Sequence, residues 1–143
     1  MRILILNGPN LNLLGRREPE IYGKTSYAEL CEMIAAHCES LGIEHTVLQS
    51  NHEGVLIDAL QEAVGCYDGI VFNPAAYTHT SIAIADAVAA IGIPTVEVHI
   101  SDVSKREDYR RVSYLRSHCV ATVSGRGLQG YLDAIDLLVG RLA

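Results

Sequence analysis

The chain has 143 residues, of which 49% are hydrophobic and 20% are charged. This composition excludes a disordered chain, and the length is below the roughly 200 residues that a TIM barrel needs. A net charge of −6, with no Trp and one Phe, argues against nucleic acid or an anionic membrane as partner. We expect a single catalytic domain over residues 1–143 with an aliphatic core.

Strand and helix signals alternate along the chain. Five runs of five or six residues are β-branched and almost continuously apolar, which is typical of parallel strands covered on both faces. Helical patterns lie between them. In chain order the expected elements are a strand at Arg2–Asn7, a helix at Ser26–Leu41, a strand at Glu44–Gln49, a helix at Glu53–Val64, a strand at Gly69–Asn73, a helix at Ser81–Ile91, a strand at Thr95–Ile100, a short helix from Ser104, a strand at Cys119–Ser124 and a helix at Gly130–Leu142.

Capping motifs support several of these boundaries. Ser26 and Glu29 form a capping box at the start of the first helix, and Gly42 follows its last turn. A second capping box, from Ser104 to Glu107, predicts the short helix. Because strands and helices alternate, we expect a doubly wound α/β sandwich, and five parallel strands favour the flavodoxin-like order 2-1-3-4-5.

Polar side chains gather where the predicted strands end. In open α/β sheets, ligands bind beyond the carboxyl ends of the strands, near the switch in strand order. The first, third and fourth strands are neighbours in the expected order, so the residues that end or follow them should converge. These residues are Asn10, Asn73, His79, Glu97, His99 and Ser101. The long connection Leu11–Thr25 carries Arg17 and Tyr22. Together with Arg106 and Arg110, it is expected to close over the site.

Each of these side chains also has a purely structural interpretation. Asn10 and Asn73 are common turn residues, and His79 could cap the helix that follows it. His99 could be a core histidine with Glu97 as its buried partner. Only the joint placement at three strand ends favours a functional site over these alternatives.

The basic residues are unevenly distributed. Eight of the 11 Lys and Arg residues lie in Arg16–Lys24 and Lys105–Arg116. In an acidic protein, such stretches are either solvent-exposed surface or an anion-binding site. Tyr22, within the first stretch, is either a loop aromatic packed on the surface or a phenol available to the site.

Several chemistries lack their sequence signals. No GxGxxG motif follows the first strand, no P-loop is present, and His79 and His99 lack metal-ligand spacing. We see no signal peptide and no apolar run of membrane-span length. The cysteines form no CxxC pair and are expected to be buried free thiols in a reducing cytoplasm: Cys31, Cys38, Cys66 and Cys119.

The remaining residue types describe a site without metal or cofactor. A phenol, imidazoles, amides, a serine and arginines suit proton transfer on a small, hydroxylated, anionic molecule. A noncatalytic binding module and a flavin or nucleotide carrier stay open as alternatives. The combination of Tyr22, Arg17 and His99 favours an enzyme, because a binding module needs no such set.

Five motifs carry a resemblance to a known family. They are Asn7–Gly23, Gln49–Gly54, Asn73–Ser81, Glu97–Ser101 and Arg106–Tyr114. With these motifs the chain resembles type II 3-dehydroquinate dehydratases over essentially its whole length. The resemblance implies a flavodoxin-like fold and a cytoplasmic homo-dodecamer, a tetramer of trimers. It also implies cofactor-free dehydration of 3-dehydroquinate to 3-dehydroshikimate in the shikimate or quinate pathway.

The resemblance also implies roles for individual residues. Tyr22 matches the base that removes a proton from C2, and Arg17 matches the lid arginine that favours the phenolate. Asn10 matches the residue that holds a water against the enolate. His99 matches the acid that protonates the departing C1 hydroxyl, and Glu97 matches the partner that orients it.

Further positions match substrate contacts. His79, Ile100, Ser101 and Arg110 match substrate-binding positions, and Asn73 matches a hydrogen-bonding residue near the acid. Asp86 matches a carboxylate supplied by a neighbouring subunit, and Arg106 matches a second arginine beside the tyrosine. The chain departs from the pattern at Ala75, where a glycine is common, and at Asp102, where Asn is frequent. If the glycine position needs a positive φ, Ala75 would affect the loop geometry.

Overall fold

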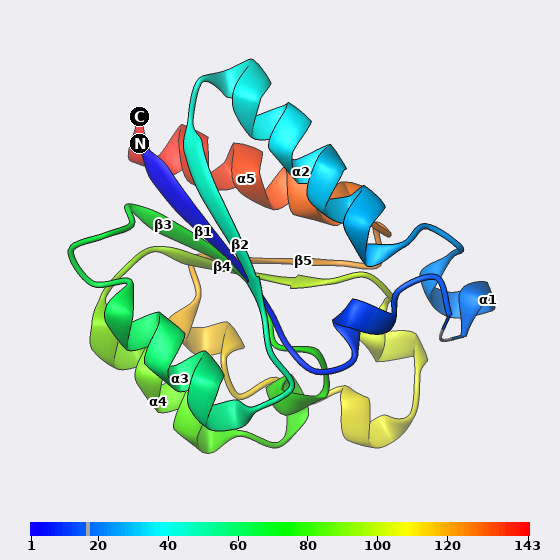
Figure 1. Ribbon diagram of the computed structural model, residues 1–143. Helices are drawn as coiled ribbons and strands as arrows, with labels where there is room; N and C mark the ends of the chain where they lie inside the picture. Colours follow the sequence, from blue (N-terminus) through cyan, green and yellow to red (C-terminus); the bar gives the residue numbers. More distant parts are fainter. Residues whose placement is uncertain (17) are drawn as a thin grey trace.

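The computed structural model describes residues 1–16 and 18–143, with the side chain of Tyr22 outside the description. Its centre is a parallel sheet in the order β2-β1-β3-β4-β5, which confirms the flavodoxin-like α/β prediction (Figure 1). The strands are β1 (Arg2–Asn7), β2 (Glu44–Gln49), β3 (Gly69–Asn73), β4 (Thr95–His99) and β5 (Ala121–Ser124). The first three match their predicted bounds; β4 ends one residue early and β5 begins two residues late.

Helices cover both faces of the sheet. Figure 1 shows α2 (Tyr27–Leu41) and α5 (Gln129–Leu142) on one face, and α3 (Glu53–Glu62) and α4 (Ile82–Ile91) on the other. Successive side chains of β1 alternate between the two cores, so Ile5 packs in the α2–α5 core and Leu6 in the α3–α4 core. Each core is mainly aliphatic, as the composition predicts, with one fully buried aromatic ring in each, Tyr131 and Phe72.

Serine side chains cap two of the helices, and the cap of α2 is the predicted one. Ser26 Oγ accepts a hydrogen bond from Glu29 N at 3.1 Å, and Gly42 ends α2 with a φ of 66°. Ser81 Oγ accepts from Ile84 N at 3.0 Å and caps α4. Ser81, not His79, therefore caps this helix, and the capping interpretation of His79 is wrong.

The basic segment after β4 differs from its prediction. In place of a short helix begun by Ser104, it forms two 3-10 turns, Val103–Lys105 and Asp108–Arg110, with Arg106 extended between them. Asp102 Oδ1 accepts from Ser104 N at 3.1 Å and from the Ser104 hydroxyl at 2.6 Å. The cap therefore lies two residues earlier than predicted, and Glu107 pairs with Arg110 instead of completing a capping box.

The long connection after β1 also contains short helical turns. A 3-10 turn spans Leu11–Leu13, and α1 spans Pro19–Tyr22. Two further 3-10 turns, Ala75–His79 and Arg116–His118, were not predicted. Proline opens α1 at its first position, where the missing N–H is not needed.

The thiols are free, but their burial varies. Cys38 is buried, Cys31 and Cys119 are half-buried, and Cys66 is exposed. The prediction of burial is therefore wrong for Cys66, which lies in the turn after α3 beside Gly65. Among the described residues, no helix is long and apolar enough to cross a membrane.

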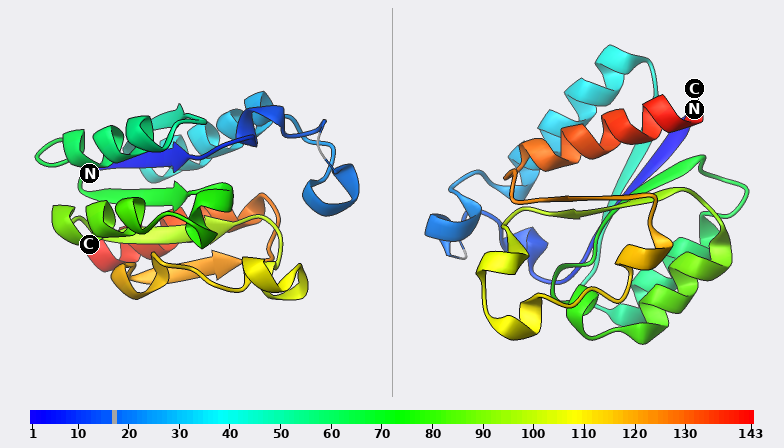
Figure 2. Two further views of the ribbon diagram at one scale, coloured as in Figure 1. Left: turned by 90° about the horizontal axis from the view of Figure 1, so that it is seen from below. Right: turned by 180° about the vertical axis from the view of Figure 1, so that it is seen from behind.

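The carboxyl ends of β1 and β3 meet closely. Asn7 is in register with Asn73, and Gly8 N donates to Asn73 O at 2.8 Å. A Cβ on Gly8 would lie 2.5 Å from Pro74 O, so this approach requires glycine. Figure 2 shows the strand arrows pointing toward the edge where α1 and residues 103–110 lie.

Candidate active site

A pocket lies at this edge, where the strand order reverses between β1 and β3. It encloses about 480 Å³ of space, counting the part open to solvent. Residues from three strand ends and the basic segment line it: Pro9, Asn10, Leu11, Asn73, Ala75, Ala76, His79, His99, Ile100, Ser101, Val103, Arg106 and Arg110. Five of the six residues expected to converge from the strand order line the pocket, and so do three others singled out from the sequence, Ile100, Arg106 and Arg110.

The pocket wall holds a buried carboxylate–imidazole pair. Glu97 and His99 lie two residues apart on β4, so both side chains point to the same face of the sheet. His99 Nε2 lies 2.5 Å from Glu97 Oε2. Glu97 is fully buried and His99 is 4% exposed, yet His99 lines the pocket. An ionised Glu97 accepts a hydrogen bond from Nε2–H and so fixes the tautomer and orientation of the ring.

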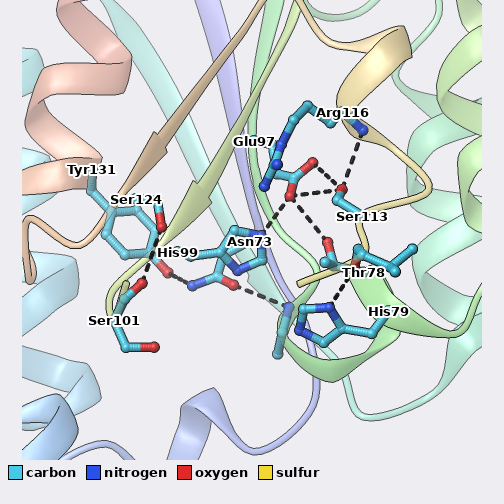
Figure 3. A network of polar contacts seen from close by, with 12 residues as sticks. Asn73, Thr78, His79, Glu97, His99, Ser101, Ser113, Arg116, Ser124 and Tyr131 are labelled. Atoms are coloured by element: carbon cyan, nitrogen blue, oxygen red, sulfur yellow. Dashed lines mark hydrogen bonds and ion pairs between the residues drawn. The ribbon is translucent and has the colours of Figure 1, made fainter. Parts of the chain in front are cut away.

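Hydroxyl groups hold Glu97 from its other sides (Figure 3). Ser113 Oγ donates to Oε1 at 2.8 Å, and Thr78 Oγ1 donates to Oε2 at 3.3 Å. Burial favours the neutral carboxyl, but the hydrogen bond and charge of His99, the hydroxyl of Ser113 and the charge of Arg116 outweigh it, so the pKa of Glu97 is lowered. Glu97 is therefore ionised at neutral pH.

His79 stands beside this pair in a different environment. Its Nδ1 lies 2.6 Å from Val112 O, and its ring stacks on that of His99 with centroids 6.2 Å apart. Burial, together with the charges of His99 and Arg110, lowers the pKa of His79 against the opposing hydrogen bond to Val112. Nδ1–H therefore donates to the carbonyl, and a neutral ring presents Nε2 as an acceptor.

The two asparagines combine turn geometry with pocket lining. Asn10 adopts a φ of 70° before the turn Leu11–Leu13, and its N–H donates to Asn51 Oδ1 at 3.0 Å. Asn73 Oδ1 accepts from Ala75 N at 3.0 Å. The turn interpretation is thus correct for both residues, and it is compatible with a place in the pocket.

Ala75 adopts a left-handed backbone, with a φ of 53°. The glycine position noted in the sequence therefore does use a positive φ, and this chain keeps that conformation with an alanine. An L-residue with a Cβ pays about 1–2 kcal/mol for it. The hydrogen bond from Ala75 N to Asn73 helps to hold the turn.

Arginines supply positive charge on the loop side of the pocket. The side chains of Arg106 and Arg110 are 12% and 17% exposed. Arg106 Nη2 lies 3.6 Å from Glu18 Oε2, and Arg110 Nε donates to Glu107 Oε2 at 2.8 Å. Lys105, by contrast, is largely exposed. The second basic stretch therefore contains both solvated residues and residues that face the pocket.

Among the described residues singled out from the sequence, Glu97 and Asp86 do not line the pocket of this chain. Glu97 lies behind His99, and Asp86 is exposed on α4. Arg17 lies outside the described residues, as does the side chain of Tyr22. Among the residues that the structure describes, no cluster of three or more His, Cys, Asp or Glu side chains could hold a metal ion.

Sequence reasoning missed three side-chain hydroxyls that form hydrogen bonds to the site residues from behind the pocket wall. Tyr131 of α5 is fully buried and bonds to both Asn7 and Asn73. Ser113 and Thr78 hold Glu97. Thr78 and Ser113 lie within two of the motifs that carry the resemblance but were given no role there. Tyr131 lies outside all five motifs, although a tyrosine on the buried face of a helix needs a partner for its hydroxyl.

The fold and the pocket together define an α/β protein with an acid–base site at the topological switch point. The family model described as dehydroquinase class II matches residues 1–139. A 3-dehydroquinate dehydratase from Nostoc sp. is 50% identical over 142 residues, covering 99% of this chain and 97% of that protein. A catabolic 3-dehydroquinase 1 from Neosartorya fischeri is 51% identical over 134 residues, covering 94% of this chain and 89% of that protein.

A solved structure agrees with these relatives. The type II dehydroquinase from Butyrivibrio crossotus superposes with a TM-score of 0.96 at 51% identity, and the match covers 97% of each chain. The chain therefore belongs to the class II dehydroquinase family, and its activity is that of a 3-dehydroquinate dehydratase, a hydro-lyase. The residue types left three classes of protein open: an enzyme, a binding module and a flavin or nucleotide carrier. The prediction of an enzyme is confirmed.

Proposed function

We propose that this chain dehydrates 3-dehydroquinate to 3-dehydroshikimate through an enolate, with Tyr22 as the base and His99 as the acid, and without a cofactor. The observation that carries the proposal is the buried Glu97–His99 pair at the wall of the pocket. An ionised carboxylate behind the ring stabilises the imidazolium that a general acid must form before it donates. A purely structural histidine would not need to face a pocket.

The first step removes the C2 proton, which is acidic because C2 is next to the C3 ketone. The electron pair of the C2–H bond moves into the enolate, and negative charge develops on the C3 oxygen. Fixed donors must meet this charge. We assign this task to a water held by Asn10. The left-handed backbone of Asn10 places this residue at the pocket.

The second step expels the C1 hydroxyl. The enolate re-forms the C3 ketone, a double bond forms between C1 and C2, and the C1–O bond breaks. Because hydroxide is a poor leaving group, His99 gives it a proton and it departs as water. Tyr22 then releases the C2 proton to solvent, and His99 takes up a new one, so the enzyme returns to its starting state.

The substrate is an anion with ring hydroxyls, and the lining suits both features. We assign its carboxylate to Ile100 and Ser101 at the end of β4, and a further contact to Arg110. His79 presents an acceptor to a ring hydroxyl. Arg17 and Arg106 would favour the phenolate of Tyr22. These cations set the pocket apart from the rest of a chain whose net charge is −6.

We also propose that residues 1–143 form one catalytic domain that works as a cytoplasmic homo-dodecamer, a tetramer of trimers. Asp86 is exposed on α4 and outside the pocket of its own chain, as a residue that completes a neighbour's site would be. The reaction serves either a biosynthetic or a catabolic pathway.

The test separates the two proton transfers. Purified protein is incubated with 3-dehydroquinate in deuterated water, and two signals are followed: enone formation by ultraviolet absorbance and deuterium entry at C2 by NMR. We expect His99→Asn to exchange C2 while losing about 10²–10⁴-fold in enone formation. Tyr22→Phe should lose both signals. Exchange at the wild-type rate in Tyr22→Phe would remove Tyr22 as the base.

A further inference from the structure

A buried chain of hydrogen bonds reaches Asn73 from behind the sheet. Tyr131 OH donates to Asn7 Oδ1 at 2.7 Å, and Asn73 Nδ2 donates to Tyr131 OH at 2.9 Å. Asn7 Nδ2 in turn donates to Tyr27 OH at 3.3 Å. Figure 3 shows the Tyr131 hydroxyl directed at the amide of Asn73. The chain of bonds therefore links α2, β1 and α5 to the end of β3.

The direction of these bonds follows from the number of protons available. A tyrosine hydroxyl can donate one hydrogen bond, and here it donates that bond to Asn7 Oδ1. Tyr131 can therefore only accept from Asn73, which places Nδ2 and not Oδ1 toward α5. Burial raises the pKa of Tyr131 far above its ordinary value, so the hydroxyl keeps its proton throughout the working pH range.

A second bond fixes the same amide from the other side. Ala75 N donates to Asn73 Oδ1 at 3.0 Å, which is the orientation that Tyr131 also requires. With both amide atoms held, Asn73 has one N–H and one oxygen lone pair left for a ligand. Asn73 is 3% exposed and lines the pocket.

We propose that Tyr131 is a positioning residue, whose buried hydroxyl orients the Asn73 amide so that its free N–H meets the substrate near His99. The proposal rests on the proposed function, because it assigns the geometry of one of that site's donors. Tyr131 touches no substrate itself. Its effect on turnover passes through Asn73, and a fixed donor lowers the barrier because it needs no reorientation during the reaction.

The main test is a double-mutant cycle on kcat and KM for 3-dehydroquinate. We expect Tyr131→Phe to lower kcat about tenfold while KM changes by less than about threefold, as for the loss of one aligned hydrogen bond. In the Asn73→Ala background the same change should have almost no further effect. A structural role alone would give equal losses in both backgrounds and would overturn the proposal.

Thr95→Val is the matched control. Thr95 is also fully buried, and its Oγ1 donates to Ile93 O at 2.9 Å, but it lies at the opposite end of β4 from His99. It should lose stability and keep its kcat. If wild type and Thr95→Val both fail to form the enone, the proposed function fails; if only the Tyr131→Phe loss is missing, this inference fails alone.

A second measurement covers the case in which Tyr131→Phe does not fold. In nitrogen-15-labelled wild-type protein, the side-chain amide protons of Asn73 should exchange with solvent far more slowly than those of exposed Gln61. Equal exchange rates would show that the amide is not held, and would overturn the proposal.

Discussion

Gly8 provides the sharpest test of how the site is built, because its backbone touches the loop after β3. In Gly8→Ala, the new Cβ would lie 2.5 Å from Pro74 O and 2.7 Å from Pro74 C. Both neighbours are backbone atoms, so no side chain can rotate away. An ordinary contact begins near 3.4 Å, so the two loops must separate by about 0.9 Å.

The cost of this separation has two parts. Overpacking against backbone costs about 1–3 kcal/mol. The hydrogen bond from Gly8 N to Asn73 O, now 2.8 Å, weakens at a further cost of about 1 kcal/mol. We expect the free energy of unfolding to fall by about 2–4 kcal/mol. Because Asn10 and Asn73 move apart, kcat/KM should fall by about 10²-fold as well.

Urea unfolding and steady-state enone formation measure the two effects. Gly54→Ala is the control, since Gly54 lies in α3 and a Cβ there meets nothing within 4 Å. It should leave kcat/KM unchanged and stabilise the protein by up to about 1 kcal/mol. Wild-type stability and activity in Gly8→Ala would refute the claim that this backbone contact sets the pocket.

Three further outcomes are expected. If the proposed mechanism holds, Arg17→Ala should lower kcat and move the rise of kcat to higher pH, because the phenolate of Tyr22 would lose a cation; a higher KM with an unchanged pH profile would contradict this. The free energy of unfolding, measured in urea across pH, should fall below about pH 6.5, where the unfolded chain binds a proton that the folded His79, with its lowered pKa, resists. It should fall again below about pH 4.5, as Glu97 loses the ionised form that its lowered pKa favours. His79→Asn should remove the first decline only. Finally, Ala75→Gly should raise the melting temperature, because relief of left-handed strain exceeds the chain entropy that glycine adds.

The residues that the expected topology identified share one property: they end or follow a strand. The strand order brings those ends together, so the expected topology was enough to place Asn10, Asn73 and His99 near one another. The alternation of side chains on a strand likewise put Glu97 behind His99. These are consequences of periodicity and topology, which a single sequence carries.

The groups missed by the sequence act through contacts between distant elements. Tyr131 reaches Asn7 across 124 positions, and no local pattern encodes that contact. The prediction of a short helix in the basic segment after β4 was wrong for a different reason. Ser104 and Glu107 fit a capping box, but Asp102 competes for the Ser104 N–H and starts the turn earlier. Local rules therefore fail where two capping residues lie within one turn.

The in-register pairing of Asn7 with Asn73 has a consequence for how the protein acquires activity. A slip of one residue between β1 and β3 would turn Asn7 to the α3–α4 face, away from Tyr131. A chain refolding from denaturant can therefore collapse and form helices without gaining turnover. The return of enone formation should coincide with the slow, long-range step in which β1, β3 and β4 lock together, which makes catalysis a probe of native strand register.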